Sequence, residues 1–192
     1  MDYVFGLPHV TFFSSEPGNK KMLLALSRNI IVEKIRDILC FDIHPTILHE
    51  SNGRPFIKEC PEINISISHT KGATAFILDK NNDVAVDIEV ISERACVLFD
   101  RFTKREERTL ILGESDPFYH TLFFSAKETS FKLMNRFAST ITDFSVINID
   151  TLQEKIYLRY LDSESITVRY KRLENHVITW ICQNTREHTS SM

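Results

Sequence analysis

The sequence predicts an α+β fold with mostly antiparallel sheets. Short apolar runs of strand length dominate residues 63–90 and again residues 144–182. A helical stretch lies between them at residues 93–135, and a long amphipathic helix precedes them at residues 20–41. The 192 residues are 43% hydrophobic and 26% charged, which suits one large domain or two small halves packed together.

The first part of the chain is predicted to combine one helix with four strands. The predicted strands cover residues 10–13, 63–68, 73–78 and 84–90. A turn at Asn81-Asn82-Asp83 joins the last two strands, and a polar loop containing Gly53 follows the helix. The inward face of the helix is formed by Leu23, Leu24, Ile31, Ile35, Ile38 and Leu39.

Three helices are predicted in the middle of the chain, the first at residues 93–102. The second starts at Thr103, where Thr103 and Glu106 fit a capping box. The third has Asp116 at its cap and Pro117 at its first position. Its polar stripe is formed by Thr121, Ser125, Glu128, Lys132 and Asn135. Only strands are predicted after it, at residues 144–149, 155–161, 165–170 and 177–182.

Composition limits the classes of function. The formal net charge of −3 argues against a nucleic-acid-binding protein, because such proteins need a clearly basic face. The four cysteines are scattered, with no CxxC pair and no metal-ligand spacing, which favours reduced thiols. No stretch has the pattern of a signal peptide or the length of a membrane span. We therefore expect a cytoplasmic protein.

Two acids, Asp87 and Glu89, lie two residues apart in a predicted strand. Because side chains alternate along a strand, both carboxylates are expected on one face. Glu128 and Lys132 lie four residues apart on one face of a predicted helix. Three carboxylates and one ammonium suit a magnesium ion that holds a diphosphate, because Mg²⁺ prefers a few acids completed by substrate phosphates. This combination predicts phosphoryl-transfer chemistry.

Two further segments offer hydrogen-bond donors to phosphate. One predicted strand ends in Ser68, His69 and Thr70, which provide two hydroxyls and an imidazole. Arg54 follows Gly53 in a rigid turn and presents a guanidinium, the preferred bidentate partner of phosphate. Each feature also has a purely structural explanation: acids on an edge strand, an i,i+4 helix pair, a strand-end histidine and a simple turn. The hypothesis of a phosphate site therefore rests on their combination.

Four segments resemble the motifs of the 4′-phosphopantetheinyl transferases, specifically the long surfactin/enterobactin-synthase type. In chain order they are Gly53-Arg54-Pro55-Phe56 for G-(K/R)-P-x, residues 66–70 for S-x-S-H-(S/T), residues 84–89 for (I/V)-G-(I/V)-D-I-E, and residues 124–132 for (W/F)-S-x-K-E-(A/S)-x-x-K. Arg101-Phe102-Thr103 with Glu106 is similar to the family's R-F-F-x-x-x-E segment. The resemblance covers roughly residues 28–182 and is nearest the enterobactin-synthase branch.

The resemblance implies transfer of the phosphopantetheine arm of coenzyme A to a serine of an acyl, peptidyl or aryl carrier protein. It implies that Asp87, Glu89 and Glu128 hold Mg²⁺, with Mn²⁺ as an alternative. Glu128 is also the candidate catalytic base, and Lys132 the catalytic cation beside the diphosphate. Lys127 belongs to the same motif without an assigned role. The residues implied to bind coenzyme A are Arg28, Arg54, Ser68, His69, Thr70 and Lys132.

The resemblance also implies an architecture of two similar α+β halves, an intramolecular pseudo-dimer with coenzyme A between them. The expected halves are residues 1–91 and 92–192, and the protein is expected to be a monomer. Two substitutions depart from the family pattern, since Ala85 stands in place of glycine and Phe124 in place of tryptophan. The N-terminal part is also short. None of these departures removes a metal ligand or Lys132.

Other functions and the identity of the partner stay open at this level. A metal-dependent nucleotide phosphohydrolase would use the same acids on water, and a non-catalytic homologue would only bind coenzyme A or a carrier protein. The branch resemblance implies siderophore or other nonribosomal-peptide biosynthesis, with polyketide or fatty-acid carriers as alternatives. Apolar residues that form either a carrier-docking surface or core are Phe99, Phe102, Leu110 and Leu112.

Overall fold

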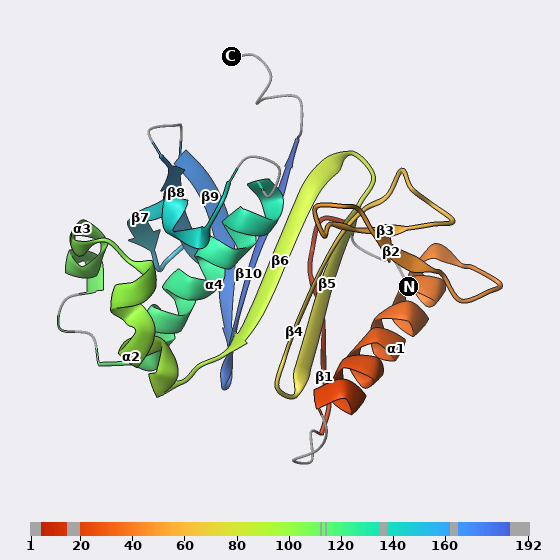
Figure 1. Ribbon diagram of the computed structural model, residues 1–192, viewed down its shortest axis with the longest axis horizontal. Helices are drawn as coiled ribbons and strands as arrows, with labels where there is room; N and C mark the ends of the chain where they lie inside the picture. Colours follow the sequence, from red (N-terminus) through yellow and green to blue (C-terminus); the bar gives the residue numbers. More distant parts are fainter. Residues whose placement is uncertain are drawn as a thin grey trace. The chain divides into compact units, whose positions relative to one another are not determined.

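The computed structural model describes residues 5–14, 20–111, 113, 115–134, 138–161 and 165–184. Its strands are β1 (His9–Phe12), β2 (Ile47–His49), β3 (Pro55–Ile57), β4 (Asn64–Thr70), β5 (Ala73–Asp79), β6 (Asn82–Val90), β7 (Phe144–Asp150), β8 (Lys155–Tyr160), β9 (Ser165–Leu173) and β10 (His176–Asn184). Its helices are α1 (Lys20–Leu39), α2 (Glu93–Phe102), α3 (Arg105–Arg108) and α4 (Pro117–Met134), with 3₁₀ turns η1 (Thr109–Ile111) and η2 (Ile141–Asp143). This order, visible in Figure 1, confirms the predicted α+β class.

The chain divides into two compact units. Unit 1 comprises Met1–Val86 and Cys182–Met192, and unit 2 comprises Asp87–Ile181. The division falls within β6 and within β10, so that only the last residues of β10, from Cys182, are assigned to the first unit. The expected boundary after residue 91 lies beyond the end of β6, and the two functional halves stay a prediction.

Unit 1 is built on an antiparallel sheet with the strand order β1-β5-β4-β3-β2. Helix α1 lies along one face of this sheet (Figure 1). Ile31, Ile35 and Ile38, spaced one helical turn apart, pack into its core, as predicted. Leu24, by contrast, is 39% exposed, so the prediction that it points inward is wrong. Among the described residues the apolar cluster under α1 begins at Ile31, although Ser27, one turn earlier, is also buried.

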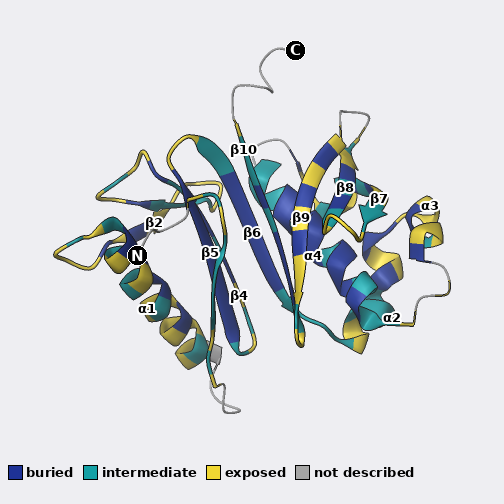
Figure 2. Ribbon diagram, turned by 180° about the vertical axis from the view of Figure 1, so that it is seen from behind, coloured by how far each residue is buried: buried dark blue, intermediate teal, exposed yellow. Residues whose placement is uncertain are grey.

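Unit 2 contains most of the second sheet, whose strand order is β6-β10-β9-β8-β7. Helix α4 crosses this sheet and is itself covered by α2 (Figure 1). Phe118, Leu122 and Ala126 form the apolar stripe by which α4 enters the core. Figure 2 shows this helix as largely buried, while β9 alternates between buried and exposed residues. A central, buried helix of this kind can carry functional side chains with little freedom of movement.

Most predicted elements are confirmed, with shifts of one to three residues at their ends, and α2 has the predicted bounds. β2 and β3 were not predicted, because each has three residues and both border the polar loop around Gly53. The predicted turn at Asn81-Asn82-Asp83 is shorter, since β6 already begins at Asn82. Only strands were predicted in the C-terminal region, but the structure also contains the 3₁₀ turn η2 there.

The helices and the cysteines bear on two further expectations from the sequence. In the described ranges, no helix combines the length and the hydropathy needed to cross a membrane. The four cysteines, all within these ranges, are free thiols.

Candidate active site

Asp87 lies at the centre of the candidate site. It occupies the interior of β6, where valine and isoleucine neighbours favour a strand, and it is 3% exposed. Its Oδ1 atom accepts a hydrogen bond from Lys132 Nζ at 2.8 Å, and its Oδ2 atom accepts one from Ser125 Oγ at 2.8 Å. A buried carboxylate with both oxygens engaged is held in one orientation.

Helix α4 supplies both partners of Asp87 and also carries Glu128. The carboxylate of Asp116 accepts a hydrogen bond from the first turn, as predicted, and fixes where the helix begins. Ser125, Glu128 and Lys132 follow at spacings of three and four residues, which places them on one face of the helix. The fold therefore brings the strand acid Asp87 and the helix cation Lys132 together.

Two further buried hydroxyls, those of Thr129 and Thr179, join Ser125 behind Asp87. Thr179 Oγ1 on β10 lies 2.9 Å from Ser125 Oγ and 2.6 Å from Thr129 Oγ1, and it donates to the Ser125 carbonyl at 3.0 Å. All three side chains are fully buried. Thr179 was missed in the sequence, because a threonine in an apolar strand carries no signal until its strand meets α4. Together these hydroxyls hold the group that orients Asp87.

The ionised form of Glu128 is disfavoured by its surroundings. Burial raises the pKa of Glu128, the negative charge of Asp87 raises it further, and the ammonium of Lys132 opposes both effects. The two carboxylates are therefore close enough to repel each other through a partly buried medium. Carboxyl groups with such raised pKa values gather at functional sites more often than elsewhere, since the strain serves binding or catalysis.

The acidic side chains around Lys132 provide oxygen donors for a divalent cation. Asp87 and Glu128 supply hard carboxylate oxygens, and the half-buried Glu89 follows on β6 two residues after Asp87. Within the described ranges, no three aspartate, glutamate, histidine or cysteine side chains are grouped closely enough to hold a metal ion. Instead Lys132 balances part of the negative charge. The chemistry fits Mg²⁺, because a cation would relieve the repulsion that raises the pKa of Glu128.

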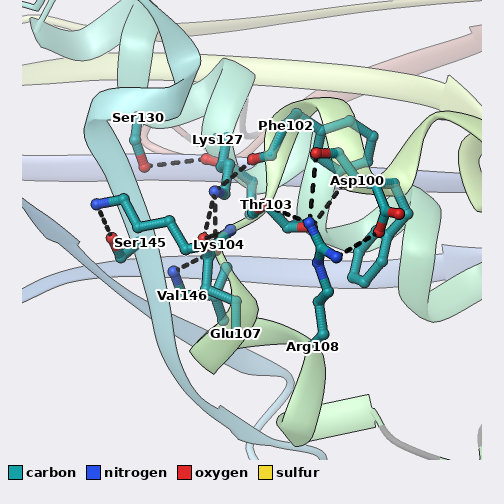
Figure 3. A network of polar contacts seen from close by, with 12 residues as sticks. Asp100, Phe102, Thr103, Lys104, Glu107, Arg108, Lys127, Ser130, Ser145 and Val146 are labelled. Carbon is teal, nitrogen blue, oxygen red and sulfur yellow. Dashed lines mark hydrogen bonds and ion pairs between the residues drawn. The ribbon is translucent and has the colours of Figure 1, made fainter.

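Lys127, whose role the sequence left open, is fully buried and forms an ion pair with Glu107 at 2.7 Å (Figure 3). Burial lowers the pKa of Lys127, while its hydrogen bond and charge contact with Glu107 act in the opposite direction.

The predicted capping box is wrong by one residue: Glu107, not Glu106, caps α3 by accepting from the Lys104 backbone N–H at 2.7 Å. Three residues separate Thr103 from Glu107, so the spacing R-F-F-x-x-x-E also selects Glu107 rather than Glu106.

The predicted arginines for coenzyme A both have partners within unit 1. Arg54 Nη2 lies 3.0 Å from Asp83 Oδ1, and Arg28 Nη2 donates to the Ile47 carbonyl at 3.2 Å. Gly53 adopts a φ of +86°, a left-handed conformation that favours glycine and produces the predicted turn before Arg54. These contacts orient each guanidinium.

The predicted Ser-His-Thr segment forms the end of β4. Ser68 is buried, His69 is exposed and Thr70 is half-buried, as expected where a strand emerges from the sheet. These residues belong to unit 1, whereas Asp87 and Lys132 belong to unit 2. The roles implied for Ser68, His69 and Thr70 stay predictions.

The apolar residues considered for docking divide into two kinds. Phe99 and Phe102 are 7% and 6% exposed and belong to the core of unit 2, so the core interpretation is confirmed for both. Leu110 is 40% exposed, and Leu112 lies outside the described residues.

Comparison with known proteins gives one match. The family model described as the 4′-phosphopantetheinyl transferase superfamily matches residues 83–183, which is more than half of the chain. No curated protein matches the sequence. The matched range contains Asp87, Glu89, Glu128 and Lys132.

Proposed function

The chain belongs to the 4′-phosphopantetheinyl transferase superfamily, and we propose that it transfers the phosphopantetheine arm of coenzyme A to a serine of an apo carrier protein. The observation that carries the proposal is the family match over residues 83–183. This range includes the four residues on which the chemical argument from the sequence depends: Asp87, Glu89, Glu128 and Lys132.

The geometry of unit 2 supports this proposal. One ammonium lies against Asp87, and the pKa of Glu128 is raised in part by the same carboxylate. A diphosphate with a divalent cation is the kind of ligand that would balance these charges. Transfer from such a ligand depends mostly on positioning and charge neutralisation, which rigid acids and a cation provide.

Each residue has a distinct role in the proposed reaction. Asp87, Glu89 and Glu128 hold Mg²⁺ or Mn²⁺, which when bound neutralises the diphosphate of coenzyme A. Glu128 accepts the proton of the attacking serine hydroxyl, directly or through water. Lys132 donates to the leaving phosphate, and Ser125 keeps the carboxylate of Asp87 oriented.

The remaining contacts with coenzyme A are proposed for unit 1. We assign its phosphates and nucleotide to Arg28, Arg54, Ser68, His69 and Thr70. Binding by Arg54 requires its Asp83 ion pair to be shared with or exchanged for phosphate. Because that pair is partly exposed, the exchange is expected to cost little.

The biological setting is proposed from the sequence motifs. The Phe-Ser-Ala-Lys-Glu form at residues 124–128 favours the enterobactin-synthase branch, and with it a carrier of siderophore or other nonribosomal-peptide synthesis. The presence of two five-stranded sheets is compatible with an intramolecular pseudo-dimer. The cytoplasmic, monomeric state is proposed from the sequence resemblance.

The intact mass of apo carrier proteins tests the proposed reaction. Peptidyl, aryl and acyl carriers are incubated with the protein, coenzyme A and Mg²⁺, and a gain of one phosphopantetheine is expected on at least one of them. The gain should disappear with EDTA and with Asp87→Asn, which keeps the shape of the side chain. Asp150→Asn is the matched control, because this acid on β7 accepts hydrogen bonds from the backbone of its own turn.

Two other outcomes would overturn the proposal. Loss of intact coenzyme A without a carrier would indicate the phosphohydrolase. If coenzyme A or a carrier binds but no carrier gains mass, the protein is a non-catalytic binding homologue.

A further inference from the structure

Glu107 is the centre of a polar network inside the core of unit 2. It is 2% exposed and accepts hydrogen bonds from three elements (Figure 3). Lys127 Nζ on α4 lies 2.7 Å from Oε1 and 3.0 Å from Oε2. The backbone N–H groups of Lys104 and Val146 donate at 2.7 and 2.9 Å, from the start of α3 and from β7.

Lys127 completes the network from the side of the helix. Besides Glu107, its ammonium donates to the Phe102 carbonyl at the end of α2, at 2.7 Å. A fully buried ammonium with directed bonds to two partners allows α4 neither to rotate nor to slide without breaking them. The next residue along the helix is Glu128.

Stability alone is a poor explanation for this buried pair. Taking two charges out of water costs several kcal/mol, and apolar residues of similar volume are often as stable or more stable. What an ion pair with fixed bonds adds is a single arrangement of the elements that it joins. Here those elements are α4, the α2–α3 junction and β7.

We propose that Glu107 is a positioning residue that acts through Lys127 to set where the carboxylate of Glu128 lies. The inference deepens the proposed function and rests on it for the role of Glu128. A residue advances an α-helix by 1.5 Å and 100°, so anchoring Lys127 fixes the backbone of its neighbour closely. A misplacement of about 1 Å at a reacting group can cost about 100-fold in rate.

Three variants distinguish an effect on the position of Glu128 from an effect on the stability of the fold: Glu107→Gln, Lys127→Met and the double variant. Each single variant leaves one buried partner unpaired and should lower the melting temperature. The double variant removes both charges and should recover most of that loss. At a temperature where all are folded, kcat should fall about 10- to 100-fold in all three, with the KM for coenzyme A unchanged within about twofold.

Mn²⁺ affinity measured by calorimetry without coenzyme A gives a second readout. It should weaken about 10-fold or more in the double variant, because Glu128 no longer lies in place. Ser145→Ala is the matched control: it removes the acceptor of the exposed Lys104 side chain beside the network and should change neither quantity.

The outcomes distinguish this inference from the proposed function. A double variant with wild-type kcat and Mn²⁺ affinity shows that the pair is only structural and overturns the inference. If the wild type modifies no carrier but its Mn²⁺ affinity depends on Glu107 as expected, the positioning role stands and the transferase fails. If the wild type neither modifies a carrier nor binds Mn²⁺, both are wrong.

Discussion

Lys132 Nζ lies 2.8 Å from Asp87 Oδ1, across 45 residues of sequence. The ammonium thus neutralises the acid assigned to the metal, and it also lowers the repulsion felt by Glu128. Lys132 supplies the positive charge beside Asp87. Binding of a cation and of a diphosphate would therefore redistribute contacts that Lys132 already makes.

Lys132→Met should separate these two effects. We expect kcat to fall about 100-fold or more, because a charge-stabilising donor to the leaving group is lost. Coenzyme A binding should weaken far less, while Mn²⁺ alone should bind more tightly as its competitor at Asp87 disappears. Steady-state kinetics and calorimetry measure the three quantities. Equal losses in kcat and coenzyme A affinity would contradict the assigned role.

Asp87→Asn should abolish transfer without unfolding the protein. The amide keeps the volume of the side chain, so the buried position loses charge rather than packing. Intact-mass analysis should detect no modified carrier under conditions in which the wild type is complete. Far-UV circular dichroism reports the fold. A folded Asp87→Asn variant with full transfer would remove Asp87 from the metal site.

Thr179→Val should weaken the support behind Asp87. It removes the hydroxyl that Ser125 and Thr129 share, while Ser125 keeps its bond to Asp87 and Thr129 keeps its bond to the Thr179 carbonyl. A lost hydrogen bond costs about 0.5–1.5 kcal/mol. The free energy of unfolding from urea titration should fall by that amount, and transfer should slow. Thr179→Ser keeps the hydroxyl and is the control. A larger loss of activity in the serine variant than in the valine variant would refute the hydroxyl's role.

Glu128→Gln should stabilise the metal-free protein at neutral pH. Burial and the charge of Asp87 raise the pKa of Glu128 in the folded state. The folded state then binds more protons than the unfolded state, so the stability of the wild type falls as pH rises from the unfolded value of about 4.3 through the folded value. In EDTA, the variant should melt above the wild type at pH 7, and the gap should close towards pH 4.

The exposed acid Glu106 provides the comparison for this pH series. Glu106→Gln makes the same chemical change at an exposed position and is measured alongside Glu128→Gln as the matched control. A Glu128→Gln variant that melts at the wild-type temperature at pH 7 would show that the charged carboxylate of Glu128 does not destabilise the folded protein.

Local patterns predicted the elements well. Asp116 before Pro117 marks the start of α4, and the isoleucine stripe of α1 packs as expected. The misses have local causes too. The three-residue strands are too short to show a period, and the adjacent Glu106 and Glu107 compete for one cap.

By itself the sequence determined the α+β class and the bounds of most helices and strands, because these depend on neighbours within a few positions. The residues proposed to carry the chemistry come from the sequence and stay a prediction. Only the tertiary structure decided which distant groups meet. Lys127 meets Glu107 across 20 residues, and Ser125 meets Thr179 across 54. Such pairs depend on how α4 packs against α2 and the sheet. That packing arises from the summed burial of many apolar side chains, which no single motif records.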